Sequence, residues 1–195
     1  MKGGICNNFL FKNSFAGREL LLVFSSPKYV LYIAVLYVAD FVLAINIGDK
    51  ETAFVIVTVL LNMIAGGCID FIFHMDADNR LWYKLWGERY TSFVRKKLMV
   101  EYLIQAPVIV GFLCCAICCH YRWISVLCVM GYFALYGMGW IMYFSSYYLT
   151  MKKEYMHFEV AKMFAAMLVI MNPVTNFIMI FYWYLLGKRR WDQYV

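Results

Sequence analysis

The most suggestive chemistry lies near the middle of the chain, in the spacing of Asp70, His74, Asp76 and Asp78. Carboxylate oxygens and an imidazole nitrogen are ligands for divalent cations, and in a helix Asp70 and His74 share one face. Such a metal would suit a lipid-modifying enzyme at the membrane surface. The simpler interpretation, which we favour, is that an apolar segment ends here and its acidic residues cap the next helix. We therefore assign no metal and keep His74, Asp76 and Asp78 as candidate ligands only.

Two other clusters have the spacing of metal ligands. Glu154 and His157 form an E-x-x-H pair with Glu159 beside it, but a di-iron site of this kind needs carboxylates from partner helices. A solvated helix start explains that cluster more simply. In the second cluster thiols repeat four residues apart, and small residues at a helix contact explain them better than a soft metal does: Cys114, Cys115, Cys118 and Cys119.

Asp40 stands inside an apolar segment, where an ionisable side chain is costly and by default suggests a function. Three roles are open to it: pairing with another helix, lining a polar pathway, or binding Arg122 near the outer edge. The sequence contains no P-loop, no nucleophile elbow and no H-E-x-x-H motif. We therefore assign no catalytic residue and no cofactor.

The elements that must position these residues are membrane spans. The chain is 64% hydrophobic with a mean hydropathy of +0.66, whereas a soluble domain is roughly 45–50% apolar. We predict an all-α integral membrane protein, a polytopic bundle of five to six transmembrane segments in a single domain covering residues 1–195. The predicted elements are an interfacial helix at 8–26, spans at 29–47, 53–74, 98–119 and 123–144, and a broken span or hairpin at 160–186.

A charged helix is predicted between the second and third spans, at 76–94. Its charged residues fill the gaps between apolar ones that recur at three- and four-residue steps, the spacing of an amphipathic helix on a membrane surface. Gly87 would soften or bend its middle. The apolar residues are Leu81, Trp82, Leu85, Trp86, Tyr90, Phe93 and Val94.

The net charge of +6 comes from basic residues between the spans, so no nucleic-acid partner is expected. The two short turns at 48–51 and 120–122 carry only Lys50 and Arg122 as basic residues, and the other connections are rich in lysine and arginine. By the positive-inside rule the amphipathic helix and the N-terminus are cytoplasmic, in a multi-pass protein of the cell membrane.

The last apolar stretch is interrupted at Asn172-Pro173-Val174-Thr175-Asn176. Pro173 removes a helical hydrogen bond and disfavours helix at Asn172. If the stretch turns there and returns, the basic tail is cytoplasmic. The alternative is one long, proline-kinked span with the tail outside. With Asp40 and Asp70, we count Asn172, Pro173 and Asn176 as intramembrane polar or helix-breaking positions.

The order of these elements resembles the membrane subunits of ATP-binding-cassette exporters that move drugs, polysaccharides and lipids. In that family a helix between the second and third spans docks on a separate ATPase, often after an acidic residue and before a basic one. Here Asp76-Ala77-Asp78 and Arg95-Lys96-Lys97 occupy those places, and Asn172–Asn176 is similar to the family's re-entrant segments. The resemblance implies a homodimer, or a heterodimer with a related subunit.

On this resemblance, the chain couples a separate ATPase to export of a substrate across the bilayer. Aromatic side chains that fill a groove with charges at the rim suit such a contact. The alternatives are the metal-dependent lipid enzyme and a non-catalytic accessory membrane protein. The residues expected to contact the ATPase are Asp78, Trp82, Lys84, Leu85, Trp86 and Arg89.

Overall fold

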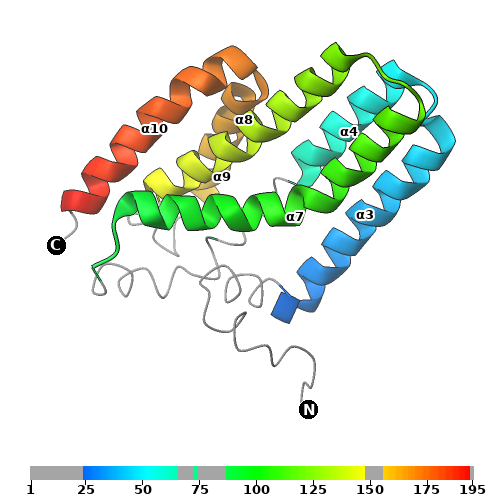
Figure 1. Ribbon diagram of the computed structural model, residues 1–195. Helices are drawn as coiled ribbons and strands as arrows, with labels where there is room; N and C mark the ends of the chain where they lie inside the picture. The colour runs from blue at the N-terminus through cyan, green and yellow to red at the C-terminus, as the bar shows by residue number, and fades with distance from the viewer. Residues whose placement is uncertain (1–23, 66–72, 74–86, 148–155, 194–195) are drawn as a thin grey trace.

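The computed structural model describes residues 24–65, 73, 87–147 and 156–193, without the side chains of 63–65, 156–161 and 163. Every secondary-structure element in these residues is an α-helix (Figure 1). The helices are α3 (Pro27–Ile47), α4 (Glu51–Ala65), α7 (Tyr90–Cys118), α8 (Trp123–Tyr147), α9 (Met156–Met171) and α10 (Pro173–Gln193).

The turns of two helical hairpins, α3–α4 and α7–α8, meet at one end of the molecule (Figure 1). Tyr121 Oη donates a hydrogen bond to the carbonyl of Gly48. Glu51 accepts from the backbone N–H of Arg122 at 3.3 Å and from the hydroxyl of Ser125. Burial raises the pKa of Tyr121 to about 12, so its hydroxyl remains a donor at neutral pH. These bonds hold the two turns together on the same side.

Helix α7 contacts α3, α4, α8 and α10 and therefore links both sides of the bundle. Figure 1 shows that it is bent partway along its length. Pro107 lies inside it and cannot donate to the carbonyl of Leu103, and we attribute the bend to this residue. One residue further on, the carbonyl of Ile104 accepts a hydrogen bond of 2.5 Å from Tyr37 of α3. The bend is thus tied to the first hairpin.

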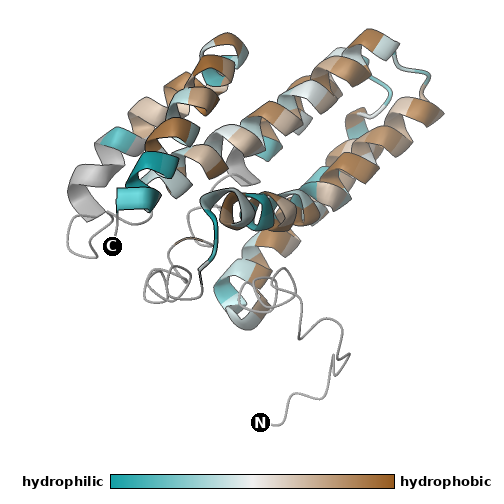
Figure 2. Ribbon diagram, turned by 60° about the vertical axis from the view of Figure 1, so that its left-hand side comes forward, coloured by the Kyte–Doolittle hydropathy of each residue, from teal (hydrophilic) through white to brown (hydrophobic). Residues whose placement is uncertain are grey.

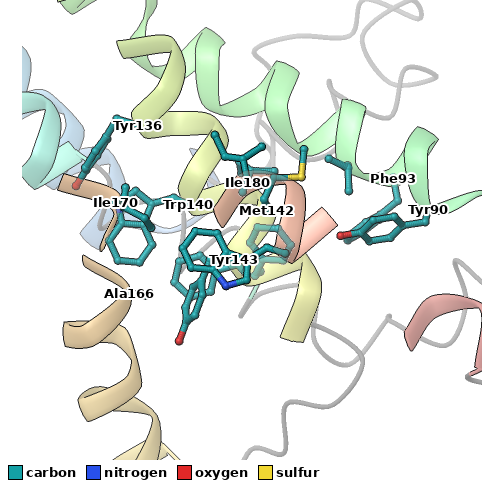
Figure 3. Packing of buried hydrophobic residues seen from close by; sticks show 14 of the residues in the cluster. Tyr90, Phe93, Tyr136, Trp140, Met142, Tyr143, Ala166, Ile170 and Ile180 are labelled. Carbon is teal, nitrogen blue, oxygen red and sulfur yellow. The ribbon is translucent and has the colours of Figure 1, made fainter. Parts of the chain in front are cut away.

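The most extensive helix contact joins α8 and α10. Aromatic rings from α7, α8 and α10 form the core here (Figure 3). The rings of Tyr143 and Trp183 meet edge to face with centroids 5.4 Å apart, which is a favoured aromatic geometry. At the crossing of the two helices, a methyl group on Gly187 would overlap Tyr90 and lie 3.1 Å from the Cα of Ser146. Close backbone approach is a usual property of helix contacts inside membranes.

Among the helices that the structure describes, three are long and apolar enough to cross a bilayer by length and composition: α3, α7 and α8. The mean hydropathy over 18 consecutive residues reaches 2.2 in α3, 1.9 in α7 and 1.7 in α8. Hydrophobic residues run along the described helices (Figure 2), and many of their large apolar side chains are exposed on the outer surface. This is the arrangement of a multi-pass membrane protein with its exposed faces in lipid. On α3 the exposed residues are Leu31, Val35, Val38, Phe41 and Ile45.

The structure confirms several predicted elements and moves the boundary of one. Helices α3 and α8 match the spans predicted at 29–47 and 123–144, and α4 covers the start of 53–74. The helix that contains the third predicted span, α7, begins at Tyr90, eight residues before the predicted 98, because residues 87–89 are not helical and Gly87 has φ +69°. The prediction of one continuous helix over 76–94 is therefore wrong at 87–89; residues from Tyr90 onward belong to α7, and 76–86 lie outside the described residues. The interfacial helix at 8–26 falls almost entirely outside the described residues.

The predicted break in the last apolar stretch is confirmed, since α9 ends at Met171 and α10 begins at Pro173. The side-chain oxygen of Asn172 accepts from the N–H groups of Val174 (3.0 Å) and Thr175 (3.4 Å), which caps α10. The hydroxyl of Thr175 donates to the carbonyl of Val169 at 2.7 Å, which satisfies the end of α9. Both helix ends at the break are thus hydrogen-bonded locally.

Candidate functional site

A column of polar side chains runs along the buried face of α7. Lys97, Glu101 and Gln105 are spaced four residues apart, so they share one face, and none is more than 2% exposed. The amide nitrogen of Gln105 donates to Glu101 Oε1. A methyl group on Gly137 of α8 would lie 3.6 Å from both the Cγ of Glu101 and the Nε2 of Gln105. Glycine at this position lets α8 pass directly over the column.

Helix α4 adds two more buried polar residues, Thr58 and Asn62, one helical turn apart. Asn62 and Gln105 line the same small cavity of about 10 Å³, so the two helices bring their amides together. Among the described residues, neither polar atom of the Asn62 side chain has a hydrogen-bond partner, and the same holds for Gln105 Oε1 and Glu101 Oε2. Buried polar atoms without partners are rare in proteins and call for an explanation.

Lys97 stands at the end of the column nearest the start of α7. Its ammonium group lies 5.4 Å from the ring centroid of Phe73 and 5.6 Å from that of Phe93. These distances are within the range of a cation–π interaction, which is stronger where water is excluded. A buried lysine is therefore held against aromatic rings at the membrane edge, one turn from the carboxyl group of Glu101.

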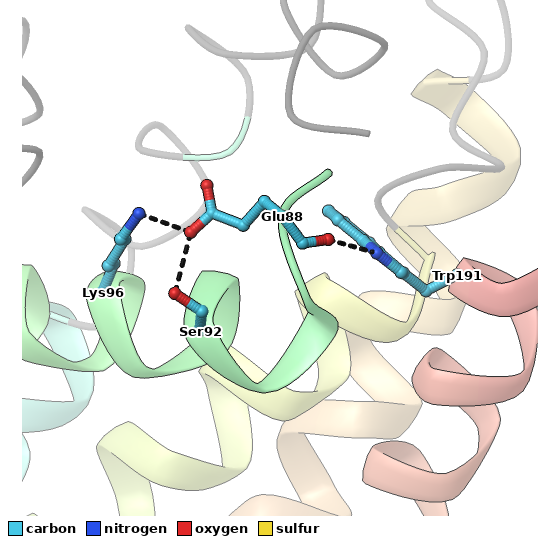
Figure 4. A network of polar contacts seen from close by, with 4 residues as sticks. All are labelled: Glu88, Ser92, Lys96 and Trp191. Atoms are coloured by element: carbon cyan, nitrogen blue, oxygen red, sulfur yellow. Dashed lines mark hydrogen bonds and ion pairs between the residues drawn. The ribbon is translucent and has the colours of Figure 1, made fainter. Parts of the chain in front are cut away.

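The start of α7 is fastened to α10, as Figure 4 shows. Trp191 Nε1 donates to the carbonyl of Glu88 at 3.1 Å, and its ring lies 5.0 Å from that of Phe93 between centroids. The carboxylate of Glu88 accepts from Ser92 at 2.9 Å and pairs with Lys96. We call this contact, made by Glu88, Ser92, Phe93, Lys96 and Trp191, the α7–α10 clamp.

Asp40 of α3 lines a separate pocket of about 430 Å³ between α3 and α7. The side chain is only 5% exposed, and its Oδ1 has no hydrogen-bond partner in the described part of the chain. A methyl group on Gly111 of α7 would lie 3.0 Å from Asp40 Oδ2. Among the described residues no ion pair joins Asp40 to Arg122, and Asp40 instead lines this largely apolar pocket.

Asn176 of α10 is another of the polar residues that the sequence singled out. Its amide nitrogen donates to the carbonyl of Leu135 in α8 at 2.8 Å, and a methyl group on Gly139 would overlap the amide. Asn176 therefore fastens α10 to α8 just after the break at Asn172-Pro173. It lies on a different helix contact from Asp40, so the predicted polar positions do not form one site.

Most of the predicted coupling and metal residues fall outside the described residues. Arg89 is described and is exposed immediately before α7. In the part of the chain that the structure describes, no group of three potential metal ligands is present, and the described cysteines are free. The residues outside the description are Asp70, His74, Asp76, Asp78, Trp82, Lys84, Leu85 and Trp86.

Sequence reasoning placed Lys97 in the basic run before the third span and assigned no role to Glu101, Asn62 or Gln105. The repeat of Lys97, Glu101 and Gln105 every four residues was the available signal, because it places three polar groups on one face of a span. No local sequence pattern indicated that Asn62 of α4 would line the same cavity as Gln105 of α7.

Searches with family models, among curated proteins and among solved structures found no match to this chain.

Proposed function

We propose that this chain is the membrane-spanning subunit of an ATP-driven transporter, in which a separate subunit hydrolyses ATP. Two copies, or this chain and a related subunit, form the path for the substrate. The observation that carries the proposal is the continuity of α7. One helix of 29 residues joins the clamp at its start to the buried polar column in the membrane.

A continuous helix transmits displacement because its backbone hydrogen bonds make it stiff. At 1.5 Å per residue, Lys97 and Gln105 lie about 10 and 22 Å along the axis from Tyr90. The connection at residues 87–89, with Gly87 at positive φ, joins α7 to the segment that we expect to contact the ATPase. A movement of that segment would reach the polar column as a shift or rotation of α7 against α8 and α4.

The polar column is the part of the interior suited to a transport path. Unsatisfied polar groups and buried ionisable groups are costly inside a membrane and mark substrate or ion pathways. Glu101, Gln105 and Asn62 retain polar atoms without hydrogen-bond partners among the described residues. Their cost is reduced whenever a polar species or water enters between α4 and α7.

The distribution of charge supports the orientation that the proposal needs. The α3–α4 and α7–α8 turns lie at one end, while α7 begins and α10 ends at the other (Figure 1). The second end carries most of the described basic residues, so the positive-inside rule makes it cytoplasmic. With the α9–α10 hairpin entering and leaving on that side, the chain has five to six membrane segments. The basic residues at this end are Lys28, Arg89, Arg95, Lys96, Lys97, Lys188, Arg189 and Arg190, whereas the turns at the other end carry Lys50 and Arg122.

The proposal is tested by the double substitution Trp82→Ala with Trp86→Ala in tagged, membrane-expressed protein. We expect normal insertion and loss of co-purification with a soluble P-loop ATPase, detected by mass spectrometry and ATP hydrolysis. Trp123→Ala is the matched control, because Trp123 is 81% exposed at the opposite end of the molecule. Wild-type protein that co-purifies with no ATPase, or a double variant that retains one, would contradict the proposal.

A further inference from the structure

The pocket at Asp40 has the composition of a binding site for an apolar molecule. Its volume of about 430 Å³ lies within the usual range for small-molecule sites, which are mostly apolar with a few polar groups. Its walls are formed by aliphatic and aromatic side chains and by the bend in α7. The lining includes Tyr37, Phe41, Ile45, Pro107, Val108 and Cys115.

The carboxyl group of Asp40 indicates which class of ligand this pocket would bind. Asp40 is the only lining residue with a carboxyl group, and Oδ1 has no hydrogen-bond partner within the described residues. A buried carboxylate is costly unless a cation accompanies it. A metal ion needs several ligands, but Asp40, Cys114 and Cys115, which line this pocket, do not form a group that could hold one among the described residues. A monovalent organic cation with large apolar groups satisfies both features.

The pocket is reached from the outer surface of α3. Phe41 and Ile45 line it and are 65% and 69% exposed, so they also belong to the apolar face of that helix. A molecule dissolved in the bilayer therefore reaches Asp40 without crossing the core. The rings of Tyr37 and Phe41 add faces that attract a cation.

We propose that the Asp40 pocket binds lipophilic monovalent cations that enter from the lipid phase. As a statement about the cargo of a transporter, the inference rests on the proposed function. As a statement about binding, it rests on the pocket and requires no ATPase. The two can therefore fail separately, and binding to the purified chain distinguishes them.

The test uses purified chain in phosphatidylcholine nanodiscs and measures equilibrium binding of radiolabelled tetraphenylphosphonium. We expect saturable, one-to-one binding that Asp40→Asn weakens at least tenfold and that tetraphenylborate, an anion of similar shape, does not displace. Asp49→Asn, which removes an exposed carboxyl group from the α3–α4 turn, is the matched control and should bind like the wild type.

A second variant keeps the test decisive if Asp40→Asn disturbs folding. Gly111→Leu leaves the carboxyl group in place but extends a side chain toward it, since even a methyl group there would lie 3.0 Å from Oδ2. We expect it to abolish binding. Wild-type affinity in either variant would overturn the proposal. Displacement of the probe by phosphatidylethanolamine would also overturn it, because a lipid amine would then be the occupant.

Discussion

Removing Trp191 should release the start of α7 from α10. The indole is 4% exposed, and its ring centroid lies 5.0 Å from that of Phe93 and 5.8 Å from that of Tyr90. Its N–H donates to the carbonyl of Glu88. Trp191→Ala removes the packing and the hydrogen bond together. Trp191→Phe keeps an aromatic ring but has no donor.

The size of the effect follows from these contacts. Truncating a buried tryptophan to alanine costs about 3–5 kcal/mol, of which the hydrogen bond accounts for about 1 kcal/mol. Trp191→Phe should therefore cost about 1–2 kcal/mol, because it loses the bond and some contact area. If opening is local, a loss of about 3 kcal/mol raises the open population on the order of 100-fold.

The assay is amide hydrogen exchange by mass spectrometry on the purified protein, read at peptides covering residues 90–97 and, for comparison, 123–130. We expect on the order of 100-fold faster exchange at the start of α7 in Trp191→Ala, about tenfold in Trp191→Phe, and no change at the start of α8. Trp123→Ala should leave both regions unchanged. Less than threefold acceleration at 90–97 in Trp191→Ala would refute the clamp as a stabilising contact.

Two further predictions concern the last hairpin. Gly139→Ala should destabilise the protein by about 1–3 kcal/mol, because the new methyl group overlaps the Asn176 amide. Thermal unfolding in detergent measures the loss of stability. Gly131→Ala is the control and should be nearly neutral, because no atom lies within 4 Å of the added methyl group. A reporter fused after residue 195 should be cytoplasmic if α9 and α10 enter and return on one side, and an external reporter would favour a single crossing.

Much of the helical layout could be predicted from the sequence, because the length and apolarity of a span are local properties. A bilayer needs about 20 apolar residues in a row, and the segments that became α3 and α8 supply them. The break at Asn172-Pro173 was also predictable, since proline removes a hydrogen bond and asparagine supplies a cap. Each of these signals acts within a few residues of its own position.

The remaining features depend on contacts between distant segments. The periodicity of 76–94 predicted one helix, but the backbone at Gly87 has φ +69° and the helix of the third span begins at Tyr90. Apolar residues at helical spacing on both sides of a glycine do not show on which side of it a helix starts. The meeting of Asn62 with Gln105 needed the packing of α4 on α7, which no local pattern encodes.

Glycine residues lie beside the buried polar side chains described above. Three buried polar groups each face a glycine on a neighbouring helix: Asp40 faces Gly111, the Glu101–Gln105 pair faces Gly137, and Asn176 faces Gly139. Close approach of two backbones excludes lipid from the polar group, while the missing side chain leaves space beside it. Asn176 uses that space for a bond from its amide nitrogen to α8, while its Oδ1, one oxygen of Asp40 and one oxygen of Glu101 have no hydrogen-bond partner among the described residues. The bond to Leu135 gives Asn176 a structural role between two helices. Among the described residues no hydrogen bond joins the carboxyl group of Asp40 or Glu101 to another helix, and there a passing or bound species would lower the free energy of the folded protein.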